Sequence, residues 1–427
     1  MELTKYKLRD LVDVTRGMSL SGQFYAEEGE FIRLTLGNFN MNGGGFKENT
    51  SKTDLYFTGA VKDEFILKKG DIITPLTEQS LGLLGTTARI PESGKYIQSQ
   101  DIALVHCKRN RIDPNFCYYL ISSNLVRQQL SAAAQQTKIR HTSPDKIMDC
   151  TVWIPNLENQ IKIGRILTDI DHKITLNRAI NDNLEKIAKQ LYDYWFVQFD
   201  FPDENERPYK SSGGAMVWNE KLKREIPQGW STAKIKDIAQ TYSGGTPTST
   251  KSDYYIGGNI PWINSGELNS PIITSTPNYI TEKGLNNSSA KLYPLYSILV
   301  ALYGATAGKV SLLSFEACSN QAVCGIIPND GDMTTYIRYY LISLYEHFIT
   351  LSSGSARDNI SQDTIKNTIL PIPTQDVLTK YSDVTKPIIE EMIENQKGLE
   401  NLIKLRDELL PLLMNGQASV NYHLFDD

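Results

Sequence analysis

The sequence predicts an α/β (α+β) protein in which two globular domains are separated by two long helices that pair as an antiparallel coiled coil. Two observations lead to this prediction. Short stretches from the first half of the chain recur in the same order in the second half, which indicates two copies of one unit. After each copy, the apolar residues change from short runs between Gly, Ser, Asn and Pro to a narrow stripe at helical spacing.

The repeat keeps its order, and its offset shrinks smoothly from 227 to 218 residues, as differences in loop length between two copies of one unit would produce. Three ordered agreements of this kind are not expected by chance. The matching stretches are residues 7–11 with 234–238, 118–122 with 339–343, and 154–155 with 372–373, together with Ser143, Asp145 and Ile147, which match Ser361, Asp363 and Ile365.

Each copy begins as a domain of strands and loops. Short apolar runs bounded by turn-forming residues predict strands at 65–67, 71–74, 102–105, 298–302 and 323–327. Residues 118–130 and 336–348 place their aromatic and aliphatic side chains at helical spacing. Both globular parts are therefore predicted to be mixed α/β domains.

The two apolar stripes predict helices over about 157–195 and 377–413, and a narrow stripe sustained over about five heptads is typical of a coiled-coil seam. Pro387 lies inside the second stripe, so that helix either starts or kinks there. The stripes consist of Ile163, Leu167, Ile170, Ile174, Ile180, Leu184, Ile187 and Leu191 in the first helix, and Tyr381, Val384, Ile388, Met392, Leu399, Leu402, Leu405, Leu409 and Leu412 in the second.

One polar residue stands at the same place in both stripes, Asn177 in the first and Asn395 in the second. A buried asparagine in a seam fixes register and partner at some cost in stability. Alternatively, each helix packs on its own domain and the asparagines face solvent. In an antiparallel pair, some 35 residues form a rod of roughly 50 Å with one globular domain at each end.

The composition is that of a soluble globular protein with more than one core, since 427 residues contain 40% hydrophobic and 22% charged residues. No apolar run is long enough for a transmembrane helix, and the charged N-terminus does not resemble a signal peptide. The five cysteines are scattered, without a CxxC pair or histidines at metal-ligand spacing. They are interpreted as structural thiols in a reducing cytoplasm.

The net charge of −5 does not exclude nucleic-acid binding, because the acidity is unevenly distributed. Residues 1–150 contain 19 Lys and Arg against 17 Asp and Glu, and residues 219–375 contain 12 of each. The excess acidic residues lie in the helical segments and the tail. Neutral domains can still carry a basic face, since phosphate binding depends on local clustering.

The sequence gives no support for catalysis, so the chain is predicted not to be an enzyme. It contains no Pro-Pro, which the base-binding loop of an adenine methyltransferase needs. Residues 304–310 approach a phosphate-binding GxxxxGK[ST] loop but have one residue too few between the glycines and no hydroxyl after the lysine. The acidic residues at 203–204 lack a nuclease pattern, and the five histidines form no i, i+4 pair. No metal or cofactor site is expected.

Several motifs resemble those of one family. Residues 243–248 (SGGTPT), 258–263 (GNIPWI) and 266–268 (GEL) resemble the start of a target recognition domain. A conserved spacer helix is resembled by residues 154–160 (IPNLENQ) and by the residues that follow them, Ile166-Leu167, Ile170-Asp171, Leu184-Glu185, Leu191, Trp195-Phe196, Phe199 and Phe201-Pro202. Residues 209–214 (YKSSGG) resemble the connector of the same family. The chain is similar over essentially its whole length to the specificity subunit of type I restriction–modification systems.

The resemblance implies a non-catalytic DNA sequence-recognition subunit. Each target recognition domain would read one half of a bipartite target in double-stranded DNA, and the helices would set the gap between the halves. The length of the predicted rod would itself hold two recognition surfaces roughly 15 base pairs apart, centre to centre, at about 3.4 Å per pair. The helices would also dock two methyltransferase subunits, to which two restriction (motor-nuclease) subunits can be added. S-adenosylmethionine, ATP and Mg are then expected on the partner subunits only, in the cytoplasm of a bacterium or archaeon, near the nucleoid.

The resemblance also divides the chain. The expected parts are a first target recognition domain (1–153), a first spacer helix (154–198), a connector (199–230), a second target recognition domain (231–373), a second spacer helix (374–416) and a C-terminal tail (417–427). The first domain departs from the family pattern at 16–19 and 32–35, where the second has Gly-Gly-Thr-Pro and Pro-Trp-Ile-Asn. Divergent domains suit two different half-sites and an asymmetric target.

Polar residues in loops near strand ends are the expected DNA contacts. In the first domain they are Arg16, Ser19, Arg33, Gln79, Arg89, Gln100, Gln136, Lys138 and Arg140. In the second domain they are Ser243, Gly244, Gly245, Thr246, Thr248, Lys251, Tyr303, Thr306, Lys309, Asn320, Gln321, Ser355, Arg357 and Asn359.

Each of these groups has a structural alternative. The backbone amides of the glycine-rich loop at 243–248 could approach phosphates, or the loop could be a plain turn beneath Trp262. Gln and Asn can pair with adenine, and Arg with guanine, but Gln100 and Gln321 match at offset 221, which equally suits a shared structural role. The cationic loops at 136–140 and 355–359 could simply face solvent.

Overall fold

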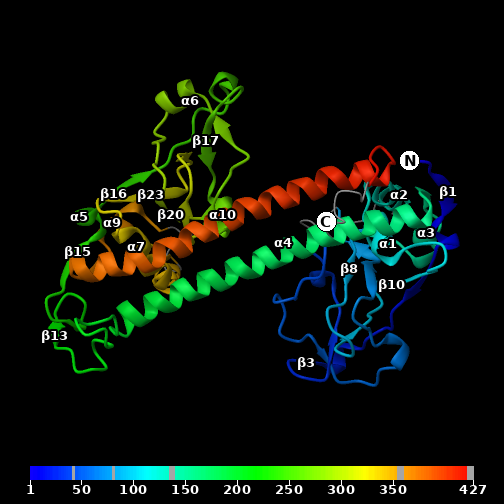
Figure 1. The fold of residues 1–427 in the computed structure, drawn as a ribbon, viewed down its shortest axis with the longest axis horizontal. Helices are drawn as coiled ribbons and strands as arrows, with labels where there is room; N and C mark the ends of the chain where they lie inside the picture. Colours follow the sequence, from blue (N-terminus) through cyan, green and yellow to red (C-terminus); the bar gives the residue numbers. More distant parts are fainter. Residues whose placement is uncertain (41–43, 79–81, 134–139, 353–359, 421–427) are drawn as a thin grey trace, which may run out of the picture. The chain divides into compact units, whose positions relative to one another are not determined.

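The computed structural model describes residues 1–40, 44–78, 82–133, 140–352 and 360–420, and the chain divides into two compact units. The first unit comprises Met1–Thr175 together with the chain from Glu400 onward, and the second comprises Leu176–Leu399. Two long helices, α4 (Leu157–Tyr192) and α10 (Gln375–Met414), contribute one part to each unit (Figure 1). Both units mix helices and sheets, which confirms the predicted fold class.

The first unit is built on a four-stranded antiparallel sheet in the order β2-β10-β6-β8. Its helices α1 and α2 supply buried residues to the same core as Leu8, Val12 and Val105. The elements of this sheet and its helices are β2 (Val12–Arg16), β6 (Ile72–Pro75), β8 (Ala88–Arg89), β10 (Ile102–Cys107), α1 (Pro114–Ile121), α2 (Asn124–Ala133) and α3 (Pro144–Met148). A second sheet in the order β3-β5-β4-β9 and two strand pairs complete the unit, from β1 (Thr4–Lys7), β3 (Tyr25–Ala26), β4 (Phe31–Arg33), β5 (Tyr56–Phe57), β7 (Thr77–Glu78), β9 (Tyr96–Ile97), β11 (Arg140–His141) and β12 (Thr151–Ile154).

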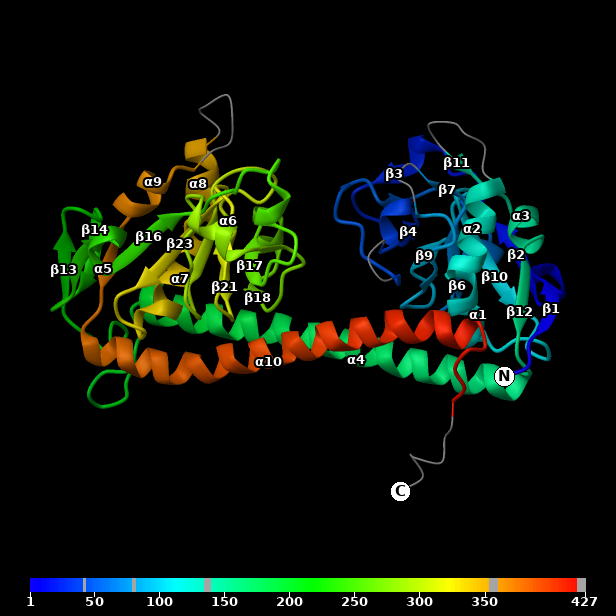
Figure 2. The same cartoon turned by 90° about the horizontal axis from the view of Figure 1, so that it is seen from above.

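The second unit is built on a five-stranded sheet in the order β16-β23-β20-β21-β18. Its strands are β16 (Ala239–Ser243), β18 (Ile272–Ile273), β20 (Ile298–Ala301), β21 (Val310–Leu313) and β23 (Val323–Pro328). The remaining strands are β13 (Met216–Asn219), β14 (Arg224–Pro227), β15 (Ser231–Lys234), β17 (Ile260–Ile263), β19 (Tyr279–Ile280), β22 (Cys318–Ser319) and β24 (Ile369–Ile372). Its helices are α5 (Ile235–Ile238), α6 (Glu282–Asn286), α7 (Met333–Ser343), α8 (Tyr345–Ser352) and α9 (Gln362–Asn367). In Figure 2, α7 lies between this sheet and the helical segments of the unit.

The two units repeat the same strand pairings, as the sequence repeat predicts. β1 pairs with β12 in the first unit, and β15 pairs with β24 in the second. β2 pairs with β10 in the same antiparallel manner as β16 pairs with β23. α1 and α7 follow these sheets and contain the matching Tyr-Tyr-Leu-Ile stretch. The repeat in the sequence is therefore a repeat in the fold.

The hydrophobic core of each unit includes residues from the end of one long helix or from the turn that follows it. In the first unit, Leu413 and Met414 of α10 belong to the same buried cluster as Ile163 and Leu167 of α4. In the second unit, Trp195 and Phe196 follow α4 and pack with Tyr381 of α10. Because 413 and 414 match 195 and 196 at offset 218, the repeat extends into both cores. Residues that are far apart in the chain thus close each domain.

Both long helices begin close to the predicted positions. α4 starts at Leu157, but after Tyr192 it continues as a π-helical turn (Asp193–Val197), not as α-helix to residue 195. α10 starts at Gln375 and runs through Pro387, which is neither its start nor its end.

The helices run antiparallel within each unit. In the second unit Asn177 contacts Asn395, and Trp195, which follows α4, contacts Tyr381. Both asparagines are half-buried, and the Asn395 amide donates to the backbone oxygen of Asn177 (2.8 Å), so neither simply faces solvent. In the first unit Asp171 contacts Arg406.

Several residues predicted in the seam are exposed. Ile180, Ile187, Val384, Leu405 and Leu412 each retain between 41% and 47% of their accessible surface. An apolar stripe alone cannot show whether a side chain faces the paired helix or another surface, so these seam assignments were wrong. The compact units also cut both helices, whereas the predicted boundaries treat each helix as a separate part.

Candidate nucleic-acid interface

Most candidate residues of the second unit lie at one edge of its five-stranded sheet. β16 and β20 end where β23 and β21 begin, because these neighbours are antiparallel. The loops that follow β16 and β20, and the turn that precedes β23, therefore meet at this edge. The sheet brings together three segments that are distant in the sequence, 243–251, 303–309 and 320–321.

The two glycines of the first loop serve close packing. A Cβ atom on Gly244 would lie 2.1 Å from the Asn320 carbonyl oxygen, and one on Gly245 would lie 2.3 Å from the Ala290 nitrogen. The Gly244 amide donates to Val323 (3.0 Å), and the Gly245 amide donates to Ser319 (2.8 Å). Since both amides are already bonded within the domain, they are not offered to a phosphate. The structure favours the alternative, a turn held beneath Trp262, whose indole donates to Gly245 O (3.0 Å).

Beyond the glycines the loop becomes exposed. Thr246 donates its hydroxyl to the Gln321 side chain, and both residues face solvent. Thr248 is also exposed, and the exposed Lys251 places its ammonium group 3.1 Å from the Tyr254 hydroxyl. Tyr255 anchors the loop by donating to Pro247 O (2.5 Å), and burial raises the pKa of Tyr255. This exposed part presents hydroxyl, amide and ammonium groups on a firmly held loop.

The other candidates at this edge are more constrained. Asn320 donates to Asn264 (3.0 Å) and accepts from the Ala322 amide (3.0 Å), which stabilises the turn before β23. Ser243 donates to Gln362 (3.0 Å). Thr306 is buried, so its hydroxyl is not positioned at the surface.

Two residues of the loop after β20 remain at least partly accessible. Lys309 is half-exposed and donates to Asn269 (2.5 Å). Tyr303 is also half-exposed and follows Leu302, whose amide donates to Ala322 O (2.8 Å). Among these candidates Thr246, Thr248, Lys251 and Gln321 are exposed, and Ser243, Tyr303, Lys309 and Asn320 are half-exposed.

The corresponding edge of the first unit contains a smaller group. Arg16 ends β2, and its Nε donates to the backbone oxygen of Gln100 (2.7 Å), just before β10 begins. The side chains of Arg16, Gln100 and Ser19 are exposed. Gly17 has almost no room for a Cβ, which would lie 2.3 Å from the Ser99 carbonyl oxygen.

Arg140 reaches the same edge through a mostly buried ion pair. Its Nη1 lies 3.3 Å from Glu78 Oε1 and 3.1 Å from the Ser131 hydroxyl. The other oxygen of Glu78 accepts the amides of Gly82, Leu83 and Leu84 at 2.9 to 3.0 Å. Arg140 therefore helps to order a loop at this edge, and 22% of its side chain remains accessible.

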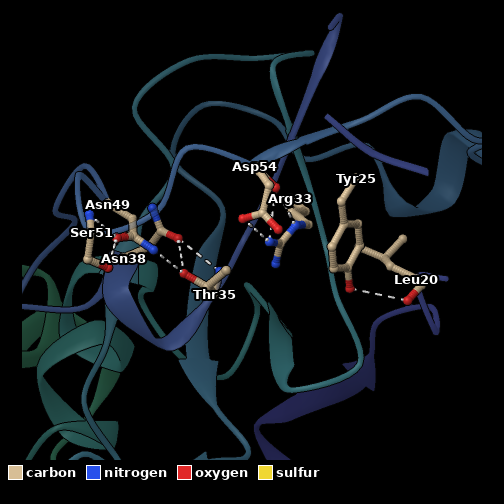
Figure 3. Close-up of polar contacts among 8 residues, drawn as sticks. All are labelled: Leu20, Tyr25, Arg33, Thr35, Asn38, Asn49, Ser51 and Asp54. Atoms are coloured by element: carbon tan, nitrogen blue, oxygen red, sulfur yellow. Dashed lines mark hydrogen bonds and ion pairs between the residues drawn. The ribbon is translucent and has the colours of Figure 1, made fainter. Parts of the chain in front are cut away.

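Arg33 and Arg89 lie elsewhere. Arg33 is 6% exposed, donates to the backbone and carboxylate oxygens of Asp54, and stacks at 3.7 Å on Tyr25 (Figure 3). Figure 3 also shows the neighbouring network in which Thr35 and Asn38 bond to each other and Asn49 donates to Thr35. Arg89 pairs with Ile72, toward the opposite end of the sheet, and stacks on Tyr118 at 4.8 Å. Both arginines support the domain, contrary to the expectation that they face DNA.

Six candidates lie outside the described residues. They are Gln79, Gln136, Lys138, Ser355, Arg357 and Asn359. A described neighbour of each of the three segments indicates where that segment attaches. Glu78 and Arg140 lie at the edge of the first unit, and the amide of Ile360 donates to Leu302 O (2.7 Å) at the edge of the second.

Sequence reasoning missed three residues that organise these edges, Glu78, Asn264 and Asn269. Asn264 follows the motif at 258–263 directly, so its position offered a signal that the selection of loop residues overlooked. Glu78 and Asn269 carry no pattern of their own, and their partners are 62 and 40 residues away. Across the described ranges, no group of three or more His, Cys, Asp or Glu is arranged to hold a metal ion, and no helix is long and apolar enough to cross a membrane.

Comparison with known proteins identifies close similarities in sequence and fold. The family model described as "Type I restriction modification DNA specificity domain" matches residues 2–186 and 227–405. The chain is 26% identical to the type I restriction enzyme HindI specificity subunit of Haemophilus influenzae, over 75% of this chain and 81% of that protein. It is also 26% identical to the MjaIX specificity subunit of Methanocaldococcus jannaschii, over 71% and 69%. The S subunit structure from M. genitalium shares the fold, with a TM-score of 0.62, 15% identity, and coverage of 97% of this chain and 96% of that chain.

Proposed function

Because the chain belongs to the family of type I restriction–modification DNA specificity proteins, we propose that its two globular domains each read one half of a bipartite, asymmetric DNA target. The observation that carries the proposal is the repeat, in which equivalent sheet edges present different side chains. The two edges share an exposed glutamine, Gln100 in the first unit and Gln321 in the second. They differ at the end of the matching strands, where the first unit exposes Arg16 and the second has the half-buried Ser243, and in Lys251, which the second unit alone exposes in the loop beyond. Different donors and acceptors at equivalent places suit two different half-sites.

The accessible residues suggest separate roles within each edge. Arg16 and Lys251 are cations that suit phosphate contacts, which position a protein on the duplex. Gln100 and Gln321 carry amides that can pair with adenine. The helices would set the gap, since the 36 residues of α4 correspond to about 54 Å of helix. The chain would supply recognition, with methyl transfer and cleavage carried out by its partners.

The experiment is to express the full chain with its methyltransferase subunit and map DNA methylation across a genome. We expect one split motif with two unlike halves. Q321A should relax or change one half only, because Gln321 lies at the edge of a single unit, and the loss of one bidentate base contact costs about 1–3 kcal/mol of discrimination. T276S, a change inside the same unit, is the matched control. A continuous motif, or a change in both halves caused by Q321A, would contradict the proposal.

We also propose that two methyltransferase subunits dock on the helices at equivalent places. Ile187 and Tyr194 are exposed to 45% and 38%, and Leu405 and Leu412 to 44% and 41%. These residues match pairwise at offset 218, and each pair is seven residues apart. Leu405 and Leu412 lie on one side of α10, whereas Ile187 lies in α4 and Tyr194 in the π-helical turn that follows it. Exposed apolar residues that recur in both copies support two equal sites, one for each copy of the partner.

Native mass spectrometry of the assembled complex tests this arrangement. I187E and L405E should each reduce the stoichiometry from two methyltransferase subunits to one, and the double variant to none, because a buried unpaired carboxylate opposes association. L176E is the matched control, since Leu176 is 61% exposed but matches the polar Glu394 in the other copy. Retention of two subunits by the double variant would exclude this docking surface.

A further inference from the structure

The repeat poses a problem of partner choice. α4 and α10 are similar helices, so each could pair with the same helix of a second copy of this chain. The Asn395 amide donates to the backbone oxygen of Asn177 (2.8 Å) and to the side chain of Asn181 (2.8 Å). Asn177 occupies the position in α4 that Asn395 occupies in α10. An Asn177 from a second copy would meet the same two acceptors, so these asparagines fix register but do not oppose pairing of two α4 helices. In α10 the residue that matches Asn181 is Leu399, so an Asn395 from a second copy would lose one of its two acceptors there.

The first unit contains a buried polar link that its counterpart lacks. Tyr119 of α1 donates its hydroxyl to Asp171 of α4 (2.6 Å), and Asp171 pairs with Arg406 of α10 (3.1 Å). The Arg406 side chain is 9% exposed, and that of Asp171 is 27% exposed. The matching positions in the second unit are Ile389 and Ala188, which are 4% and 0% exposed.

The second unit contains a different link, again without a counterpart. Arg338 of α7 is fully buried and places its Nη2 3.0 Å from both carboxylate oxygens of Glu185 of α4. Within the described ranges its Nε and Nη1 have no hydrogen-bond partner, so Glu185 is the one carboxylate that balances it. The matching positions in the first unit are Cys117, which is fully buried, and Ile403.

These four charges have consequences for pairing between copies. If α4 lay on the α4 of a second copy, Asp171 would face Ala188, and Glu185 would face Cys117. If α10 lay on a second α10, Arg406 would face Ile389, and Arg338 would face Ile403. Asp171, Glu185 and Arg338 would each lose the opposite charge that they pair with within one chain, and the cost would be largest for the fully buried Arg338. Arg406 would lose Asp171 and keep Asp407, its neighbour on α10 at 2.8 Å.

We propose that Asp171, Arg406, Glu185 and Arg338 select pairing of α4 with α10 in one chain over pairing of like helices between two copies. The asparagines set where the helices meet, and the four charges set which helices meet. The inference rests on the contacts within each unit and does not depend on which DNA sequence the domains read. It assigns to these residues a specificity that acts against a competing assembly.

The first test replaces the four charges by apolar residues. In the full chain, D171I, R406A and E185I copy the residues of the other unit, and R338M fills the space of the buried guanidinium. After refolding, the wild-type chain should be monomeric by light scattering. The quadruple variant should form dimers, with a dimer fraction at least about tenfold higher, because the charges then no longer oppose pairing of two α4 helices.

A second change identifies the pairing. N177C is added to the quadruple variant. Oxidation should then form a disulfide between two chains only where one α4 lies on the α4 of the other chain, since residue 177 then faces residue 177 of the second chain. The matched control neutralises two exposed pairs on the same helices, Glu158 with Lys162 and Asp376 with Lys380. These pairs recur at offset 218, so they cannot distinguish the two assemblies, and the control should stay monomeric.

A charge reversal keeps the proposal testable even where the quadruple variant does not fold. R406D places a third carboxylate beside Asp171 and Asp407 within one chain and should raise the dimer fraction. D171R added to R406D restores the opposite charges and should restore the monomer. Monomeric behaviour of both the quadruple variant and R406D would overturn the proposal, as would dimers that oxidation at residue 177 does not link.

Discussion

Cys107 differs from the other thiols in its hydrogen bonding. A hydrogen bond from Cys117 lowers the pKa of Cys107, whereas burial raises the pKa of Cys150 to about 11 and those of Cys318 and Cys324 to about 12. The thiolate is the nucleophile. At pH 8 we therefore expect iodoacetamide to modify the half-exposed Cys107 first, about tenfold faster than the buried thiols, measured by mass spectrometry of peptides over time.

The same time course in concentrated urea is the control, because unfolding removes the environment that separates the thiols. All five cysteines should then react at similar rates. Modification of Cys318 or Cys324 as fast as Cys107 in the folded protein would show that neither hydrogen bonding nor burial controls their reactivity.

Individual contacts were the least predictable feature of the molecule. The sequence identified Thr246, Lys251 and Gln321 as loop residues, and they are exposed at one sheet edge. It could not show that Arg33 is paired with Asp54, 21 residues away, or that Arg89 stacks on a tyrosine. The sequence does not distinguish an arginine that faces solvent from one that stacks on an aromatic ring, because the fold determines which residue lies beside it.

At the scale of the helices, Pro387 is a point of weakness. It lies inside α10, where it cannot donate a backbone hydrogen bond and its ring crowds the preceding turn. Its side chain is exposed, so little packing is lost when it is replaced. We expect P387A to raise the free energy of unfolding by about 1–3 kcal/mol and the thermal midpoint with it, measured by calorimetry.

K386A is the control for P387A. Lys386 is exposed and already has a backbone amide hydrogen, so its replacement should alter the free energy of unfolding by less than about 0.5 kcal/mol. A lower midpoint for P387A would mean that the helix requires the bend that proline introduces.

The helices were the most predictable elements, because a long apolar period is a strong signal. The start of α4 at Leu157 agrees with the sequence, and the start of α10 differs by two residues. Periodicity could not separate the residues that face the paired helix from those that face outward. Ile187 and Leu405 satisfy the same period as Ile174 and Met392 but are exposed.

At the scale of the whole molecule, the first unit depends on residues from the end of the chain. Arg406, Leu413 and Met414 are buried against α1 and the start of α4. We expect a chain that stops after Leu399 to lose hydrogen-exchange protection in α1 and around Ile163, because these residues lose apolar cover. Protection in β20 and β23 of the second unit should persist.

A chain that stops after Val420 is the control and should keep both units protected. Equal protection of α1 in the two truncated chains would show that the first domain is complete without α10. Loss of protection in both units after truncation at Leu399 would instead indicate that they unfold together.

The presence of two copies of one domain was predictable because matching stretches recur in the same order along the sequence. The division into compact units was not, since it depends on which helix ends close which core. The sequence suggested that each spacer helix is a part of its own, whereas both helices are shared between the units. The domain boundaries at 153, 198, 230, 373 and 416 remain a prediction about how the chain is organised for function.

The closing of the first core by residues 406–414 has a consequence for synthesis. A ribosome makes the first domain early, but that domain lacks its Arg406 ion pair and the cover of Leu413 and Met414 until nearly the whole chain has been translated. Prematurely terminated chains would therefore carry an unfinished N-terminal domain. Only chains translated through this segment would contain two completed domains.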